Sequence, residues 1–134
     1  WNAALAADGV SNTLTPAGLQ AELTKARGSI ENADYWSAIG VLNNIVASDP
    51  RNADAYNLLG FSYRKVKNFD SAERNYQRAL RLDPEHKGAL EYMGELYLET
   101  NRRAQAEELL ALLEKLCPEG CEERDDPRQA LSGE

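Results

Sequence analysis

The side chains that could carry chemistry in this chain are two cysteines, a single histidine and a set of regularly spaced carboxylates. Cys117 and Cys121 are separated by Pro118, Glu119 and Gly120. In a helix or a turn, a spacing of four residues places the two Cα atoms about 6 Å apart, a distance that a disulfide can bridge. We therefore expect a Cys117–Cys121 disulfide, and with it a periplasmic or otherwise extracytoplasmic location.

Two other states of the cysteine pair stay open on the sequence. Both thiols could be reduced, as is usual in a cytoplasmic protein. The pair could also bind a metal: zinc usually takes four protein ligands and no histidine lies close by in the sequence, but two thiolates can hold copper(I). A redox or metal-binding accessory protein is thus an alternative, although we expect no cofactor and no metal.

Catalysis needs several side chains held together, and the sequence offers few of them. His86 is the single histidine and stands in a predicted turn, so we interpret it as a solvated turn residue without a catalytic role. No glycine-rich phosphate loop follows a strand pattern, because the sequence contains no strand pattern. The sequence therefore favours a protein without enzymatic activity.

The elements that position these side chains are predicted to be helices. In residues 53–86, small and apolar residues fall three or four positions apart in two runs, which places each run on one face of a helix. Pro84 ends the second run. The first run consists of Tyr56, Leu59, Gly60 and Tyr63, and the second of Ala72, Tyr76, Ala79 and Leu80.

This helical hairpin resembles the tetratricopeptide repeat (TPR), a 34-residue unit with the pattern Trp-x2-Leu-Gly-x2-Tyr, then Ala-x3-Phe, then Pro. The residues that meet the pattern are Tyr56, Leu59, Gly60, Tyr63, Ala72, Tyr76 and Pro84. A shift by one repeat length aligns three columns: Pro50, Pro84 and Pro118; Ala38, Ala72 and Ala106; Ala26, Gly60 and Gly94.

The resemblance implies an all-α fold, a right-handed superhelical stack of three TPR helical hairpins with a short C-terminal cap. We place the three units at residues 19–52, 53–86 and 87–120, within a repeat domain at 16–120. Residues 1–15 are expected to form an N-terminal arm, and residues 121–134 a C-terminal capping segment or tail. Thr15 and Pro16 are a typical start for the first helix.

Two apolar features find no partner within the repeat pattern. Trp36 stands where the other units have Asp70 and Ala104, so we expect that the arm covers it or that it is an exposed binding patch. The last helix carries a wide leucine face within residues 109–116, which could pair two copies of the chain in a self-assembling structural module. The leucines of this face are Leu109, Leu110, Leu112, Leu113 and Leu116.

Composition and charge exclude further classes. No run of 18 or more apolar residues is present, so we expect no membrane insertion. The net charge of −7 argues against nucleic-acid binding, which needs a basic surface. The sequence opens at Trp1 rather than at a methionine, which is consistent with a removed signal peptide, a removed domain or a truncated chain.

By resemblance, the first helix of each unit lines a concave groove that holds a peptide or a partner protein. Glu91, Glu95 and Glu99 share a helix face there and repel by about a few tenths of a kcal/mol per pair unless a basic group lies opposite. We therefore expect a basic ligand or a solvated acidic face, with Arg64 and Lys65 serving an acidic partner instead. The matching groove positions are Leu23, Arg27, Ile30, Asn57, Phe61, Arg64, Lys65, Glu91, Glu95, Leu98 and Glu99.

Chaperone-binding members of the family grip a carboxyl-terminal carboxylate with lysine, asparagine and arginine side chains. That clamp is absent, so we expect a ligand that is an internal segment or a protein surface. Phe61, between Asn57 and Arg64, is expected to seat an apolar side chain of that ligand. The sequence thus predicts a non-enzymatic protein-protein interaction adaptor or scaffold with a protein or peptide partner. The clamp positions hold Leu23, Arg27, Leu58, Gly88 and Tyr92.

Overall fold

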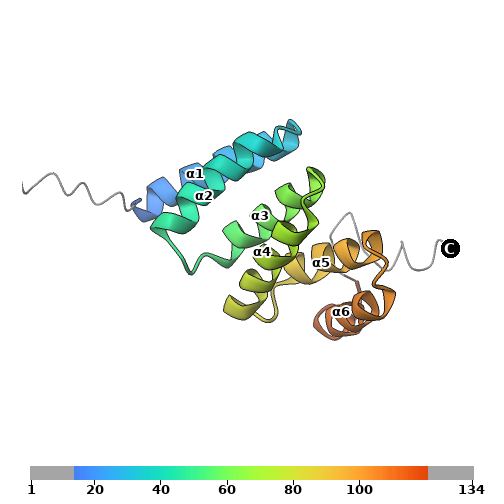
Figure 1. Cartoon of the computed structure of the whole chain (residues 1–134). Helices are drawn as coiled ribbons and strands as arrows, with labels where there is room; N and C mark the ends of the chain where they lie inside the picture. Colours follow the sequence, from blue (N-terminus) through green and yellow to red (C-terminus); the bar gives the residue numbers. More distant parts are fainter. Residues whose placement is uncertain (1–13, 121–134) are drawn as a thin grey trace, which may run out of the picture.

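The structure is a computed structural model that describes residues 14–120 of the chain. The described part contains six α-helices and no strand: α1 (Pro16–Glu31), α2 (Tyr35–Ser48), α3 (Ala53–Lys65), α4 (Phe69–Leu82), α5 (Lys87–Glu99) and α6 (Arg103–Leu116). They pair as three hairpins, α1 with α2, α3 with α4 and α5 with α6, which follow one another along the molecule (Figure 1). The predicted all-α stack of three helical hairpins is confirmed.

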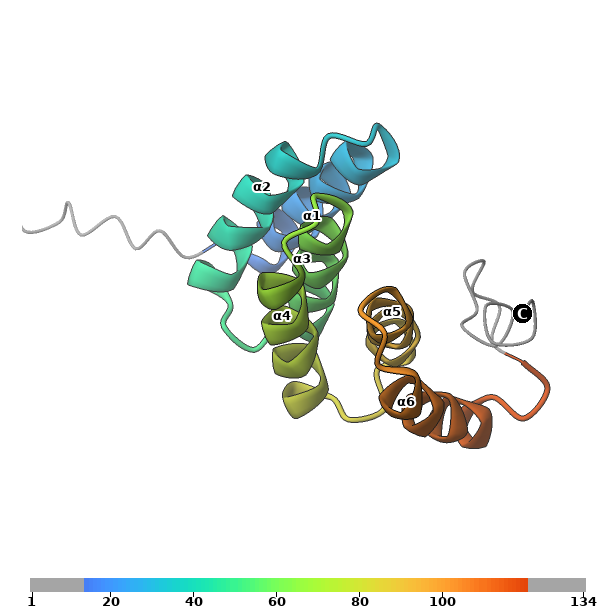
Figure 2. The ribbon, with the colours of Figure 1, turned by 45° about the vertical axis from the view of Figure 1, so that its right-hand side comes forward.

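The hairpins stack so that the first helices of the three units are neighbours. α3 contacts both α1 and α5, while α2 packs against α3 and α4 packs against α5. Figure 2 shows this succession from a second direction. We call the side formed by α1, α3 and α5 the first-helix face. None of the described helices is long and apolar enough to cross a membrane.

Local sequence signals set the ends of the helices. Thr15 caps α1 as predicted, since its Oγ1 accepts a hydrogen bond from the Gly18 N–H at 3.0 Å. Asn52 caps α3 in the same way. His86 caps α5: its Nδ1 accepts the Ala89 N–H at 3.1 Å, and its side chain is 13% exposed. The interpretation of His86 as a solvated turn residue is therefore wrong, because its imidazole is largely buried and caps the N-terminus of α5.

The turn inside each hairpin repeats the same backbone conformation. Ala33, Lys67 and Asn101 occupy equivalent places in the three units and have φ values of 58°, 67° and 65°. Only Asn101 is of a residue type that tolerates this left-handed region well. The repeat is thus visible in the backbone even where the side chains differ.

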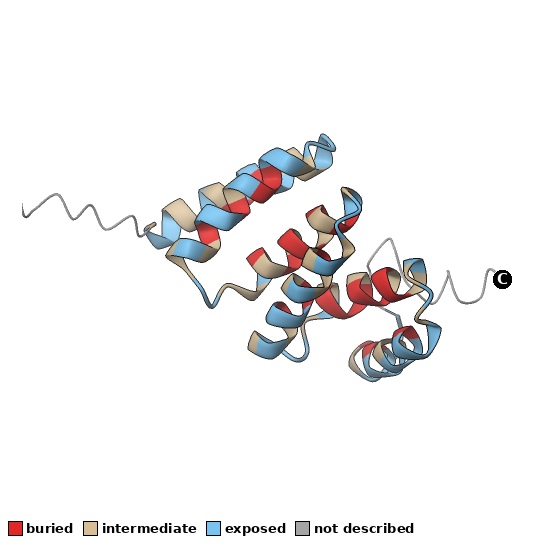
Figure 3. Cartoon of the chain, in the orientation of Figure 1, coloured by how far each residue is buried: buried red, intermediate tan, exposed pale blue. Residues whose placement is uncertain are grey.

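The core consists of apolar clusters between neighbouring helices (Figure 3). Gly60 lies where α3 crosses α4, and a Cβ added there would meet the Tyr76 ring at 2.6 Å. The absence of a side chain at Gly60 therefore allows α3 and α4 to approach closely. Tyr76 and Tyr97 are buried, whereas Tyr63 is only partly buried and packs against two clusters.

The leucine face of α6 is largely covered by the chain itself. Leu113 is buried against Leu90 of α5, and Leu80 of α4 packs against the same cluster. Only Leu112 of the five leucines is exposed by more than a third, at 38%. The core thus takes up part of the leucine face, chiefly Leu113, and the pairing of two copies through the rest of it stays a prediction.

Cys117 caps the end of α6 and is buried, while Cys121 lies outside the described residues. The expected disulfide therefore stays a prediction, and so does the location inferred from it. The capping segment at 121–134 and most of the arm at 1–15 also lie outside the described residues.

Candidate partner-binding surface

Aromatic side chains from three helices meet on the first-helix face. Phe61 of α3 lies with its ring centroid 5.1 Å from that of Tyr92 on α5 and 6.4 Å from that of Tyr35 at the start of α2. Both pairs are tilted by 60°, a favourable geometry for aromatic rings. All three side chains are partly buried, so they combine a fixed position with remaining access. We call Phe61, Tyr35 and Tyr92 the aromatic strip.

Two cations lie over the Phe61 ring, and they differ in access. The Arg64 guanidinium is 5.5 Å from the ring centroid and the Lys65 ammonium 5.3 Å, both within cation–π range. Arg64 is only 6% exposed, whereas Lys65 is exposed. Lys65 is therefore the cation beside the aromatic strip that a ligand can reach.

Arg64 joins α3 to α5 through two carboxylates. Its Nη2 lies 2.7 Å from Glu95 Oε2, and its Nη1 donates a hydrogen bond to Glu99 Oε1. Burial lowers the pKa of Arg64, but Tyr76 and the two carboxylates more than offset it and leave the pKa above its usual value. The guanidinium therefore stays charged and holds the third unit against the second.

This ion network corrects the predicted charge of the groove. Glu95 and Glu99 were expected to face a basic ligand or to form a solvated acidic face, but Arg64 of the same chain lies opposite them. Lys67 adds a weaker contact to Glu99 at 3.8 Å. The sequence could not place Arg64 there, because the pairing depends on how α3 and α5 align in space. Arg64 is likewise unavailable as a direct contact for an acidic partner.

Asn57 and Glu91, also expected in the groove, lie in the interior. Asn57 is buried on α3, and Glu91 on α5 is 0% exposed. α5 begins close to α3 at this point, and a Cβ added at Gly88 would meet Asn57 Nδ2 at 2.9 Å. The direct packing of the two first helices thus removes both side chains from the surface.

Of the eleven predicted groove positions, Arg27, Phe61 and Lys65 remain as accessible polar or aromatic contacts, with Glu95 and Glu99 partly accessible beside them, whereas Leu23 is buried. Arg27 is exposed on α1. The aromatic neighbours Tyr35 and Tyr92 were missed as contributors. Their signal was present in the sequence, since each is an aromatic residue in the first two turns of a predicted helix, but repeat matching alone did not bring them together with Phe61.

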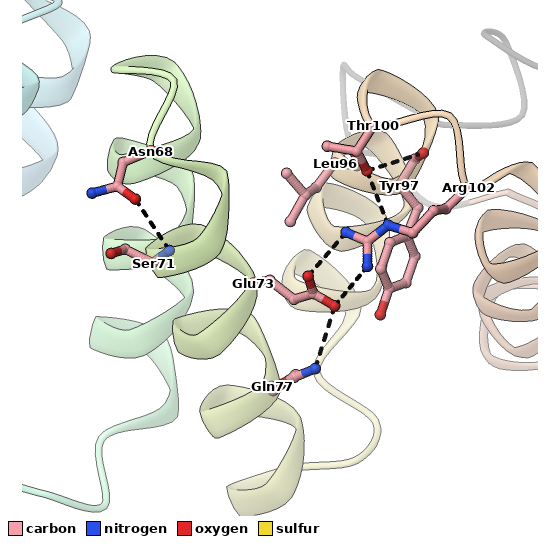
Figure 4. A network of polar contacts seen from close by, with 8 residues as sticks. All are labelled: Asn68, Ser71, Glu73, Gln77, Leu96, Tyr97, Thr100 and Arg102. Atoms are coloured by element: carbon pink, nitrogen blue, oxygen red, sulfur yellow. Dashed lines mark hydrogen bonds and ion pairs between the residues drawn. The ribbon is translucent and has the colours of Figure 1, made fainter.

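A second network, on α4, α5 and the turn after α5, fixes unit three to unit two (Figure 4). The Arg102 guanidinium bonds both Glu73 oxygens at 2.9 Å, and it lies 4.5 Å from the centroid of the Tyr97 ring. The bond to Glu73 raises the pKa of Arg102. Thr100 Oγ1 accepts from Arg102 Nε at 3.1 Å. This bidentate pair positions the third hairpin rather than a ligand.

Comparison with known proteins places the chain among repeat proteins. The family model described as tetratricopeptide repeat matches residues 53–86. The DnaJ protein P58IPK homolog B of Oryza sativa subsp. japonica is 42% identical over 72 residues, which are 54% of this chain and 15% of that protein. The matched part of the chain thus spans only a small share of this curated relative.

Two solved structures share the fold over most of their length. The first TPR of Spaghetti (RPAP3), bound to the HSP90 peptide SRMEEVD, has a TM-score of 0.76 and 20% identity, with 89% of this chain and 97% of that chain covered. The type III secretion chaperone SycD of Yersinia enterocolitica, in complex with a peptide of the translocator YopD, has a TM-score of 0.74 and 19% identity, with 89% and 87% covered. At these identities the likeness shows the fold: three hairpins packed as in such stacks.

Proposed function

Because the chain is a tetratricopeptide-repeat-containing protein, we propose that it is a non-enzymatic adaptor or scaffold module that holds a segment or surface of another protein on its first-helix face. The observation that carries this proposal is the aromatic strip with exposed Lys65 beside Phe61. Aromatic rings fixed by neighbours and bordered by a polar group are typical anchors of protein interfaces. Peptides are bound by two proteins of the same fold, Spaghetti (RPAP3) and SycD.

The charges of the face indicate the chemistry of the ligand. Arg64 neutralises Glu95 and Glu99 within the chain, so their attraction for a basic ligand is reduced. The exposed cations Lys65 and Arg27 remain on α3 and α1. We therefore infer a ligand segment that places an apolar side chain on Phe61 and a carboxylate near Lys65. This reverses the basic ligand considered from the sequence.

The groups with shifted pKa values support a function without catalysis. Such groups often mark active sites, but here each shift has a structural cause. Burial raises the pKa of Tyr76 and of Tyr97, and Arg64 and Arg102 are held by carboxylates between units. These described groups act in packing and in ion pairs, so none is assigned a catalytic role.

A selected peptide tests the proposal. A displayed library of random peptides is panned on the full chain, and the affinity of an enriched peptide is measured for variants. Phe61→Ala should weaken binding by about 30-fold, which is the loss expected for a hot-spot residue worth about 2 kcal/mol. Lys65→Glu should weaken the binding of peptides that carry acidic residues and should reduce the salt dependence of that binding.

Lys115→Glu is the matched control, because Lys115 is an exposed lysine in the last turn of α6, away from the strip. It should leave the affinity unchanged. If the enriched peptides bind Phe61→Ala and Lys65→Glu as tightly as the parent, the first-helix face is not the site and the proposal fails.

A further inference from the structure

The exposed side of α2 differs from the other second helices of the hairpins. No residue of α2 from Tyr35 to Ser48 carries a charge, although 28% of the chain is charged. At Gly40, Asn44 and Ala47 the equivalent residues of α4 are all arginines. We define the α2 exposed face as the exposed residues of this helix, Trp36, Ser37, Gly40, Asn43, Asn44 and Ala47.

Trp36 makes this face a candidate for contact with another segment. It is 65% exposed, and with Leu112 it is one of the two exposed large hydrophobics in the described part of the chain. A Cβ added at Gly40, one turn further along, meets no atom within 4 Å. The glycine is thus not required by packing within the described residues, and the helix that carries the indole is uncharged.

The described part of the chain begins at Leu14, which lies beside the C-terminal end of α2. Leu14 packs against the first core cluster, and its N–H donates to Ser48 Oγ at 2.6 Å. Ser48 is the last residue of α2, and Trp36 lies twelve residues before it, which is about 18 Å along a helix. The segment that precedes Leu14 therefore starts at one end of the α2 exposed face.

Residues 1–13 have the length and composition to cover the face. Thirteen residues span about 20 Å even at the short rise of a helix, and about 43 Å when extended, so they reach Trp36 in either conformation. Asp8 is the sole charged side chain among them, and the rest includes Trp1, Leu5, Val10 and four alanines. A segment with a single charged residue can pack on an uncharged face at little desolvation cost, because few charged groups lose their hydrating water.

We propose that residues 1–13 lie along the α2 exposed face, parallel to α2, with their apolar side chains against Trp36. The segment then covers the exposed side of the second helix of the first hairpin. This inference concerns the exposed side of α2 and does not rest on the function proposed above.

The test uses Trp36 as a reporter. Trp1→Phe leaves Trp36 as the sole indole, since the chain has two tryptophans. Acrylamide quenching and the emission maximum are then recorded for this protein and for the same protein cut before Leu14, with circular dichroism as a check of the fold. Removal of residues 1–13 should increase quenching and shift the emission of Trp36 to longer wavelength.

A pair of glycine variants in the full Trp1→Phe chain supplies the control. Gly40→Glu places a charge on the α2 exposed face, and Gly28→Glu makes the same change on α1; a Cβ at either site meets no atom within 4 Å. Gly40→Glu should raise the quenching of Trp36 toward that of the cut protein, and Gly28→Glu should not. Equal quenching in the full and cut chains would overturn the proposal. Protection that survives the cut and grows with protein concentration would also overturn it, because it would assign the face to a second copy.

Discussion

A methyl group at Gly60 should destabilise the protein, whereas the same group at Gly40 should stabilise it. Both glycines lie inside helices, where alanine is favoured over glycine by about 1 kcal/mol. They differ in surroundings: a Cβ at Gly40 meets nothing within 4 Å, whereas one at Gly60 lies 2.6, 2.7 and 2.8 Å from three atoms of the Tyr76 ring. Carbon atoms in contact normally lie about 3.5–4.0 Å apart, so the ring or α3 must move by about 1 Å.

The movement at Gly60 is hard to accommodate. Tyr76 is fully buried, and its ring is enclosed by the second core cluster. Overpacking of this kind costs about 1–3 kcal/mol, which exceeds the gain in helix propensity. Gly60→Ala should therefore lower the free energy of unfolding by up to about 2 kcal/mol, while Gly40→Ala should raise it by about 0.5–1 kcal/mol.

Urea unfolding followed by circular dichroism measures both values in the full chain. A second variant, Gly60→Ala with Tyr76→Leu, should be less destabilised than the sum of the two changes, because the smaller side chain relieves the contact. The reasoning is refuted if Gly60→Ala stabilises the protein as Gly40→Ala does, since the α3–α4 crossing would then have room that the structure does not show.

Three further changes test other parts of the structure. Arg64→Met should lower the free energy of unfolding by about 2–4 kcal/mol, because two partly buried carboxylates lose their cation, and adding Glu95→Gln should recover part of this in a double-mutant cycle. Burial raises the pKa of Tyr76 above that of an unfolded tyrosine, so its contribution to stability is fully present below about pH 10 and is lost as the pH rises further. Chemical denaturation at alkaline pH should show this fall, and Tyr76→Phe should reduce it. Alkylation of unreduced, natively produced protein followed by intact mass should add no adduct if Cys117 and Cys121 are paired, whereas two adducts would mean free thiols and remove the support for an extracytoplasmic location.

The helices were predictable from the sequence because their determinants are local. Thr15 and Pro16 mark the start of the first helix in the sequence, and α1 begins at Pro16; Pro84 ends the second apolar run, and α4 ends two residues before it at Leu82. Asparagine or threonine caps mark several starts, and Asp–Pro pairs follow the ends of α2 and α4. The repeat spacing then set the pairing of the helices, because each hairpin has one apolar face to bury.

The candidate surface was predictable only in part, because burial depends on contacts between units. Repeat matching placed Phe61 and Lys65 on the first-helix face, but it could not reveal that Arg64 bonds Glu95 and Glu99 across the α3–α5 contact. His86 is another example: its role as the cap of α5 and its 2.6 Å contact with Asp54 of α3 join residues of two units. Such contacts follow from the rotation of one hairpin against the next, which a single-helix pattern does not determine.

Chemical-shift mapping of a bound peptide tests the central claim most directly. Isotope-labelled full chain is titrated with a peptide enriched by panning, and the shifts of the backbone amides are followed. Binding on the first-helix face predicts that the largest changes fall on α3 and α5 around Phe61, Lys65 and Tyr92, with little change on the outer residues of α4 and α6. Shifts centred on Leu112 or on the α2 exposed face, with none near Phe61, would contradict the account.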